Sequence, residues 1–192
     1  MKKVIESERP DLIMLTGDIV CSKNTGEAWL KLTKVPVDAG VPRGVTFGNH
    51  DRECELTNKQ ILETIRTLPY CITVDGPPGV AGTGNYILEI KAEGSAKTEA
   101  LIYCLDSHSS FSSEEALGTY EWIDFSQITW YRDRSGQFTA SNGGKPLPSL
   151  AFFHIPLPEF NEVAGREDTY GVYKERVCSP DLNSGLYTAM QE

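Results

Sequence analysis

The chain has 192 residues, of which 40% are hydrophobic and 23% charged, and this balance predicts one globular domain over 1–192. Its net charge of −9 excludes a surface built for duplex nucleic acid, because such a surface needs a basic stripe. No apolar run approaches the ~18 residues of a membrane span, and the first residues lack the apolar core of a signal peptide, so we expect a soluble protein with no membrane partner.

The first part of the chain alternates between helix and strand. A helix should end before Pro10, and the apolar run 12–15 then predicts a buried strand. Apolar residues at helical spacing predict a second helix over 27–35, which Pro36 should kink or end. A second strand over 44–47 follows. This alternation is typical of an α/β sandwich.

The next segment continues with one helix and then changes to strands. Thr57 is a good N-cap for a helix that Pro69 should stop. Two apolar segments, 85–90 and 100–105, predict strands joined by a polar hairpin at 93–97.

The last part of the chain contains two long polar segments, which we expect to be loops. In chain order we predict a Ser- and Glu-rich loop at 107–121, a helix at about 125–134, a surface loop at 135–148, a strand at 150–153 and a last helix opened by Ser179 or Asp181. We expect the five scattered cysteines to be buried, reduced thiols, and their odd number favours a reducing compartment such as the cytoplasm.

Polar side chains that can bind metals follow three of the predicted strands. Asp18 follows the first, Asn49, His50 and Asp51 follow the second, and His154 follows the last. Ligands gather beyond the carboxyl ends of strands in α/β sheets, so these residues are candidates for one site. Read singly, Asp18 also fits a turn aspartate and His154 a core histidine. The run 48–51 is more specific, because an amide, an imidazole and a carboxylate follow one another after a glycine.

Six motifs together resemble one known family. They are Leu-Thr-Gly-Asp at 15–18, Phe-Gly-Asn-His-Asp at 47–51, Gly-Asn-Tyr at 84–86, Leu-Asp-Ser at 105–107, Phe-Phe-His-Ile-Pro at 152–156 and Cys-Ser-Pro-x-Leu-Asn-Ser-Gly at 178–185. With them the chain resembles the calcineurin-like metallophosphoesterases, and within these the purple-acid-phosphatase-like group. The resemblance implies an αββα sandwich, and an enzyme that hydrolyses a phosphate mono- or diester with a metal-activated hydroxide at a dinuclear site.

The same resemblance implies a role for each candidate residue. Asp18 would bridge two metal ions, and Asn49 and His154 would ligate the second of them. His50 would act as leaving-group acid or charge stabiliser, with Asp51 orienting its ring. Ligands of these types suit Mn, Fe or Zn. Purple acid phosphatases carry an iron-binding tyrosine three residues after the Gly-Asp aspartate, where this chain has Cys21, so we expect no purple chromophore.

The chain departs from the family pattern at both ends. The Asp-x-His motif expected on a first strand and the later Gly-His-x-His motif are absent, and the histidines are His50, His108 and His154. We therefore expect an internal fragment, in which the first strand and the C-terminal part of the sandwich are missing and which hydrolyses phosphate esters feebly or not at all. The alternative is a catalytically inactive fragment or paralogue that serves as a binding or regulatory module.

The substrate is open at this point between a small phosphate ester and a phosphoprotein. His108 lines the substrate cleft in one interpretation and makes an ordinary loop hydrogen bond in the other. Three aromatic residues, Trp122, Trp130 and Tyr131, read as core or loop-anchoring side chains.

Overall fold

Two parallel strands form the first sheet of the computed structural model, which describes residues 1–111, 118–172 and 174–192. β1 (Ile13–Thr16) pairs with β2 (Arg43–Thr46), and the register sets Thr16 beside Thr46. The two strands therefore end at the same level, and the loops that follow them begin side by side.

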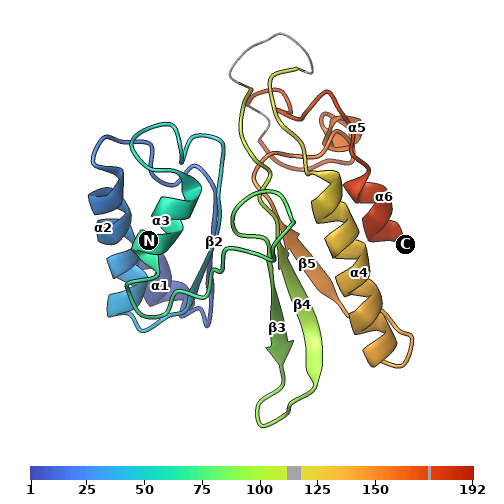
Figure 1. Cartoon of the computed structure of the whole chain (residues 1–192), viewed down its shortest axis with the longest axis horizontal. Helices are drawn as coiled ribbons and strands as arrows, with labels where there is room; N and C mark the ends of the chain where they lie inside the picture. Colours follow the sequence, from blue (N-terminus) through green and yellow to red (C-terminus); the bar gives the residue numbers. More distant parts are fainter. Residues whose placement is uncertain (112–117, 173) are drawn as a thin grey trace.

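Helices cover the outer face of this sheet (Figure 1). They are α1 (Lys2–Glu8), α2 (Thr25–Asp38) and α3 (Asn58–Ile65). Trp29 of α2 and Ile61 of α3 are fully buried with Val45 and Phe47 in one hydrophobic cluster. The expected cap of α3 is confirmed, since Thr57 and Gln60 form a reciprocal capping box.

Three strands form the second sheet, with further helices on its outer side. β3 (Tyr86–Lys91) is antiparallel to β4 (Thr98–Cys104), and β4 is parallel to β5 (Ser149–Phe152). The helices of this half are α4 (Phe125–Ser141), α5 (Phe160–Val163) and α6 (Leu186–Gln191). Leu101 and Tyr103 of β4 pack with Tyr131 of α4 and Leu186 of α6 in a second cluster.

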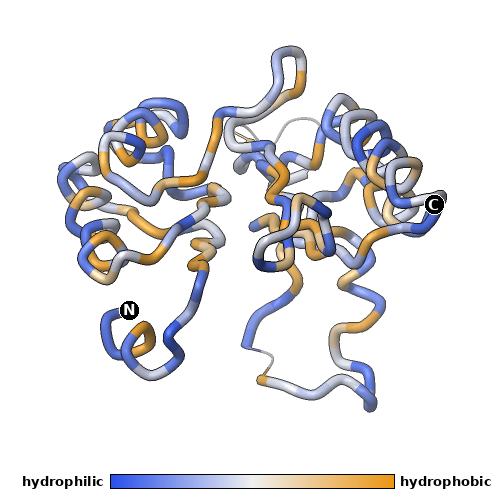
Figure 2. Tube along the Cα trace, turned by 90° about the horizontal axis from the view of Figure 1, so that it is seen from below, coloured by the Kyte–Doolittle hydropathy of each residue, from blue (hydrophilic) through white to orange (hydrophobic). Residues whose placement is uncertain are grey.

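The two sheets lie between the helices, so the layers follow the order helix, sheet, sheet, helix of the expected αββα sandwich (Figure 1). A third cluster, with Tyr86, Ile102 and Cys104 at its centre and Met14 against it, joins the sheets. The Tyr86 hydroxyl donates to the Val45 carbonyl at 3.1 Å. Figure 2 shows hydrophobic segments mostly inside each half and hydrophilic segments along the outer loops. Within the described residues, no helix has the length and apolar character of a membrane span.

Several element boundaries differ from the prediction. Pro36 lies inside α2, which continues for two more residues; a proline so near the end removes little helical hydrogen bonding. α4 runs on through the expected loop to Ser141, because Phe138 packs against the second cluster. The last helix begins at Leu186, after Gly185, rather than near residue 180.

Two further expectations concern loops and thiols. The part of the predicted loop 107–121 that comprises residues 112–117 lies outside the described residues. All five cysteines are free, but only Cys104 is buried, whereas we expected buried thiols throughout; Cys21 and Cys54 lie in exposed loops.

Candidate metal and active site

Asp51 joins the loop after β1 to the loop after β2. Its carboxylate is fully buried and accepts four backbone hydrogen bonds. The donors are the N–H groups of Asp18 (2.9 Å), Ile19 (2.8 Å), Val20 (3.2 Å) and Gly48 (2.8 Å). One side chain thus fixes the backbone at the carboxyl ends of both strands, and a carboxylate suits this place because it accepts several bonds at once.

Asp18 and His154 meet at this edge of the sheets. The Nε2 atom of His154 lies 3.1 Å from Oδ2 of Asp18, and its Nδ1 atom lies 2.9 Å from the carbonyl oxygen of Thr16. A carbonyl can only accept, so we assign the donated proton to Nδ1. In the neutral ring, Nε2 then turns a lone pair toward a carboxylate oxygen. Two electron-rich atoms so placed need a cation between them, either a proton or a metal ion.

Two glycines make this approach possible. A Cβ atom at Gly17 would lie 2.3 Å from Nδ1 of His154, and one at Gly48 would lie 2.2 Å from Oδ1 of Asp18. Gly17 also has φ +92°, and Asp18 follows with φ 52°, a conformation that aspartate tolerates better than most residues. The chain therefore turns sharply at this point and directs the Asp18 carboxylate at His154.

We expect Gly17→Ala to displace His154 and destabilise the fold. The control is Gly94→Ala in the β3–β4 hairpin, because Gly94 has φ +72° and a Cβ atom at this position would have no neighbour within 4 Å. Gly94→Ala measures the backbone strain alone, which should lower the free energy of unfolding by about 1–2 kcal/mol. Gly17→Ala should lower it by at least twice that amount, as measured by urea unfolding. Equal losses for the two variants would show that the close contact with His154 has no energetic effect.

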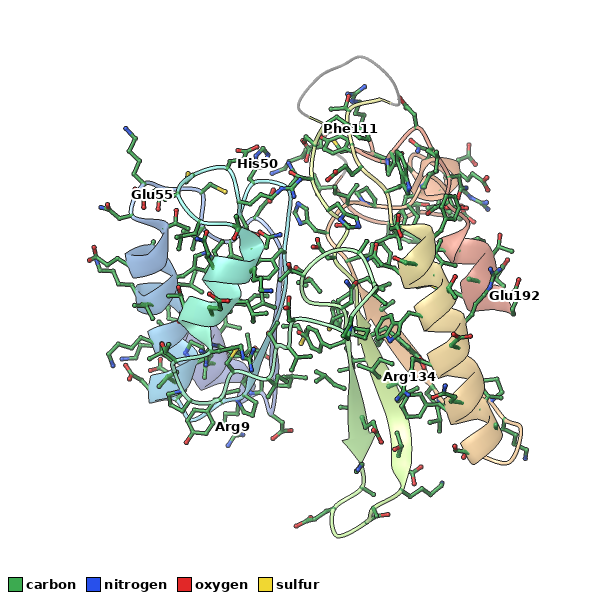
Figure 3. All side chains as sticks on the ribbon, in the orientation of Figure 1. Arg9, His50, Glu55, Phe111, Arg134 and Glu192 are labelled. Atoms are coloured by element: carbon green, nitrogen blue, oxygen red, sulfur yellow. The ribbon has the colours of Figure 1, made fainter. Side chains whose placement is uncertain are left out.

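His50 lies on the rim of the same edge (Figure 3). Its backbone N–H donates to Oδ1 of Asp18 at 2.9 Å, and its Nε2 atom is 4.0 Å from Oδ2. We expected Asp51 to orient the ring, but Asp51 binds backbone groups, and Nδ1 of His50 lies 2.8 Å from Oε1 of Glu53 instead. The hydrogen bond with Glu53 raises the pKa of His50 above its ordinary value, and the nearby Asp18 carboxylate adds to this. The ring is about half exposed, at 49%, so it can reach a bound molecule.

Asn49 is held in place through its backbone, which leaves its side chain available. The Ser109 hydroxyl donates to the Asn49 carbonyl at 3.0 Å. Asn49 is 5% exposed, yet its side-chain amide makes no hydrogen bond with any residue that the structure describes. The amide atoms keep some solvent exposure, so the amide oxygen is available to bind a metal ion.

These observations fit one metal ion better than two. Asp18, His154 and the Asn49 amide offer a carboxylate, an imidazole and an amide oxygen, a donor set suited to Mn, Fe or Zn. Within residues 1–111, 118–172 and 174–192, however, no three His, Cys, Asp or Glu side chains gather as metal ligands. The dinuclear centre that the resemblance implies is thus not seen among the described residues, and it stays a prediction.

Three residues around the site were missed by sequence reasoning. Glu53 supports His50, while Ser107 accepts hydrogen bonds from the N–H groups of His154 (3.2 Å) and Ile155 (2.9 Å). Ser109 holds Asn49. The spacing of Glu53, three residues after His50, was a usable signal. Ser107 lies in the Leu-Asp-Ser motif at 105–107, to which no role was given, and Ser109 gave no signal; the partners of the two serines lie 47 to 60 residues away in the chain.

The fold and this edge define an α/β protein with a candidate metal site built on strand ends. Comparison with known proteins then gives the family, since a model of calcineurin-like phosphoesterases matches residues 1–181. The chain belongs to the calcineurin-like phosphoesterase family.

Curated relatives include proteins named as purple acid phosphatases and a yeast phosphatase. The chain is 32% identical to "Probable inactive purple acid phosphatase 29" of Arabidopsis thaliana, over 99% of the chain and 53% of that protein. It is 31% identical to "Probable inactive purple acid phosphatase 14" of the same plant, over 100% of the chain and 53% of that protein. It is also 32% identical to "Phosphatase DCR2" of Saccharomyces cerevisiae, over 99% of the chain and 35% of that protein. The chain thus spans about half the length of the plant relatives, and less of the yeast one.

Proposed function

We propose that the protein is a metal-dependent phosphohydrolase that cleaves a phosphate ester, either a small molecule or a phosphoprotein. The observation that carries the proposal is the pairing of Asp18 with His154 at 3.1 Å, directly beside His50. Membership of the calcineurin-like phosphoesterase family supports it.

In this proposal each residue at the edge has one task. Asp18, Asn49 and His154 would hold a divalent ion, and Asp51 would keep the two loops that carry Asp18 and Asn49 in register. A bound ion would supply positive charge to the phosphoryl oxygens and activate water as the nucleophile. His50, whose pKa the hydrogen bond with Glu53 raises, would donate a hydrogen bond or a proton to the leaving oxygen.

The direct test is hydrolysis of 4-nitrophenyl phosphate by the chain in the presence of Mn²⁺, Zn²⁺ or Fe²⁺, with EDTA as the negative control. We expect slow release of nitrophenol that requires the metal and disappears in Asp18→Ala. Binding of inorganic phosphate should be measured on the same samples by calorimetry. A chain that binds neither metal nor phosphate would overturn the proposal.

A non-catalytic binding or regulatory module is the second candidate. It is favoured by the names of the plant relatives, which are called inactive, and by the lack of a three-residue His, Cys, Asp or Glu cluster in the described part of the chain. Metal-dependent phosphate binding without turnover in the same assay would support this candidate over the enzyme.

A further inference from the structure

A cavity lies beside residues that contact the metal-site loop. It has a volume of about 150 Å³ and opens between the loop after β4 and the start of α4. Its walls are Ala81, His108, Phe111, Glu121, Trp122 and Asp124. Pockets for whole drug-sized ligands usually measure ~300–1,000 Å³, so this one fits a single ring-sized group.

Short contacts connect this pocket to the metal-site loop. Ser109, next to His108, donates its hydroxyl proton to the Asn49 carbonyl, and its N–H donates to Oε2 of Glu121 at 2.7 Å. The same oxygen of Glu121 pairs with Arg52 at 3.1 Å, two residues after His50. Figure 3 shows His50 in the first half and Phe111 in the second, toward the same end of the molecule. A molecule bound at His50 would therefore extend toward the pocket.

The imidazole of His108 is held in one tautomer. The Nε2 group of Gln127 donates to Oδ1 of Asn85 and to the Asp106 carbonyl, both at 2.7 Å, so its Oε1 is the acceptor. That oxygen lies 2.8 Å from Nε2 of His108, which must donate. The neutral ring then keeps a lone pair on Nδ1, and no residue that the structure describes donates to it. His108 has φ 63°, a conformation uncommon outside glycine and a few polar residues.

The remaining walls are aromatic and acidic. Phe111 and Trp122 form a tilted pair with ring centroids 5.8 Å apart. Glu121 carries a negative charge that Arg52 offsets, and Asp124 carries another that no cation pairs with in the described chain. The Ser126 hydroxyl and N–H hold the pKa of Asp124 below its ordinary value, so this carboxylate stays charged. Aromatic faces, a carboxylate and an imidazole lone pair all favour a cation that donates hydrogen bonds.

We propose that this pocket binds the leaving group of the substrate and selects an aromatic alcohol that carries an ammonium group. The inference rests on the proposed function, and it also changes the interpretation of Trp122, which we expected to be a core or loop-anchoring residue. His108 then lines the substrate cleft, the first of the two interpretations given above.

Binding to the pocket can be tested without any metal. The ¹⁵N-labelled chain would be titrated with benzylammonium, neutral benzyl alcohol and anionic benzoate while the indole signal of Trp122 and the ring signals of His108 are followed. We expect saturable shifts at both residues, with benzylammonium binding about fivefold tighter than benzyl alcohol and benzoate not saturating. Glu121→Gln, which can still accept from Ser109, should reduce that preference. The matched control is Glu99→Gln, on an exposed glutamate of β4 that pairs with Lys97.

The link to the metal site needs a second titration with Mn²⁺ present. We expect 4-(aminomethyl)phenyl phosphate to bind at least tenfold tighter than benzylammonium, because both of its ends are held at once. Mn²⁺ binding, followed by electron paramagnetic resonance, distinguishes a failure of the pocket proposal from a failure of the proposed function. If Mn²⁺ binds but benzylammonium leaves Trp122 and His108 unshifted, or if the phosphate adds no affinity, the pocket proposal is overturned. If benzylammonium binds but Mn²⁺ does not, the proposed function fails and the cation preference of the pocket stands.

Discussion

Asp51→Ala is expected to lower the free energy of unfolding by at least about 4 kcal/mol. Its buried carboxylate accepts four backbone hydrogen bonds, and an unsatisfied buried N–H costs ~1–3 kcal/mol. A loss of this size removes most of the stability of a domain at the low end of the typical ~5–15 kcal/mol, so the variant should unfold at a much lower urea concentration than the unsubstituted chain. Urea unfolding followed by circular dichroism measures the effect.

The control for Asp51→Ala is Asp38→Ala, which removes an exposed carboxylate paired only with Lys34 in α2. That variant should change stability by less than about 0.5 kcal/mol. Asp51→Asn should fall between the two, because its amide oxygen still accepts bonds while its NH₂ group faces backbone donors. If Asp51→Ala unfolds like the unsubstituted chain, the loops are held by other contacts, and a direct role of Asp51 beside His50 becomes the better account.

His50→Ala is expected to reduce metal-dependent hydrolysis by about 10²–10⁴-fold, the usual contribution of a positioned acid or base. The ring is half exposed and its hydrogen bond is with Glu53 on the surface, so its loss should leave stability nearly unchanged. The measurement is the rate of 4-nitrophenyl phosphate hydrolysis at saturating metal, together with metal affinity by calorimetry.

The comparison with Asp18→Ala makes the His50 result informative. His50→Ala should keep its metal affinity but hydrolyse the substrate much more slowly, whereas Asp18→Ala should lose both metal binding and hydrolysis. A His50→Ala variant with undiminished turnover would remove His50 from the mechanism while leaving the metal site intact.

Sequence reasoning was most successful where a local pattern decides the structure. The apolar runs before Asp18, Asn49 and His154 predict strands, and the parallel pairing of β1 with β2 brings the ends that carry Asp18 and Asn49 together. His154 follows β5 of the other sheet, so its contact with Asp18 depends on how the two sheets pack. The capping residue Thr57 was also read correctly.

Contacts between distant residues could not be predicted in the same way. The family resemblance implied that Asp51 orients the ring of His50, but the carboxylate accepts hydrogen bonds from backbone groups of the first loop, more than 30 residues earlier. α4 continues through Gly136 because the partly buried Phe138 packs against the second cluster, and no pattern of helix-forming residues reveals that packing. Whether each cysteine is buried likewise depends on which parts of the folded chain pack around it.

The central claim is that Asp18, Asn49 and His154 together bind one metal ion, and metal binding by the chain tests it most directly. Titration of Mn²⁺ or Zn²⁺ by calorimetry should give one site, and each Ala substitution at these three positions should weaken binding at least tenfold. His108→Ala, which removes a histidine outside the ligand set, should leave the affinity within about twofold. A chain that binds no ion, or that binds it equally well after His154→Ala, would contradict the account.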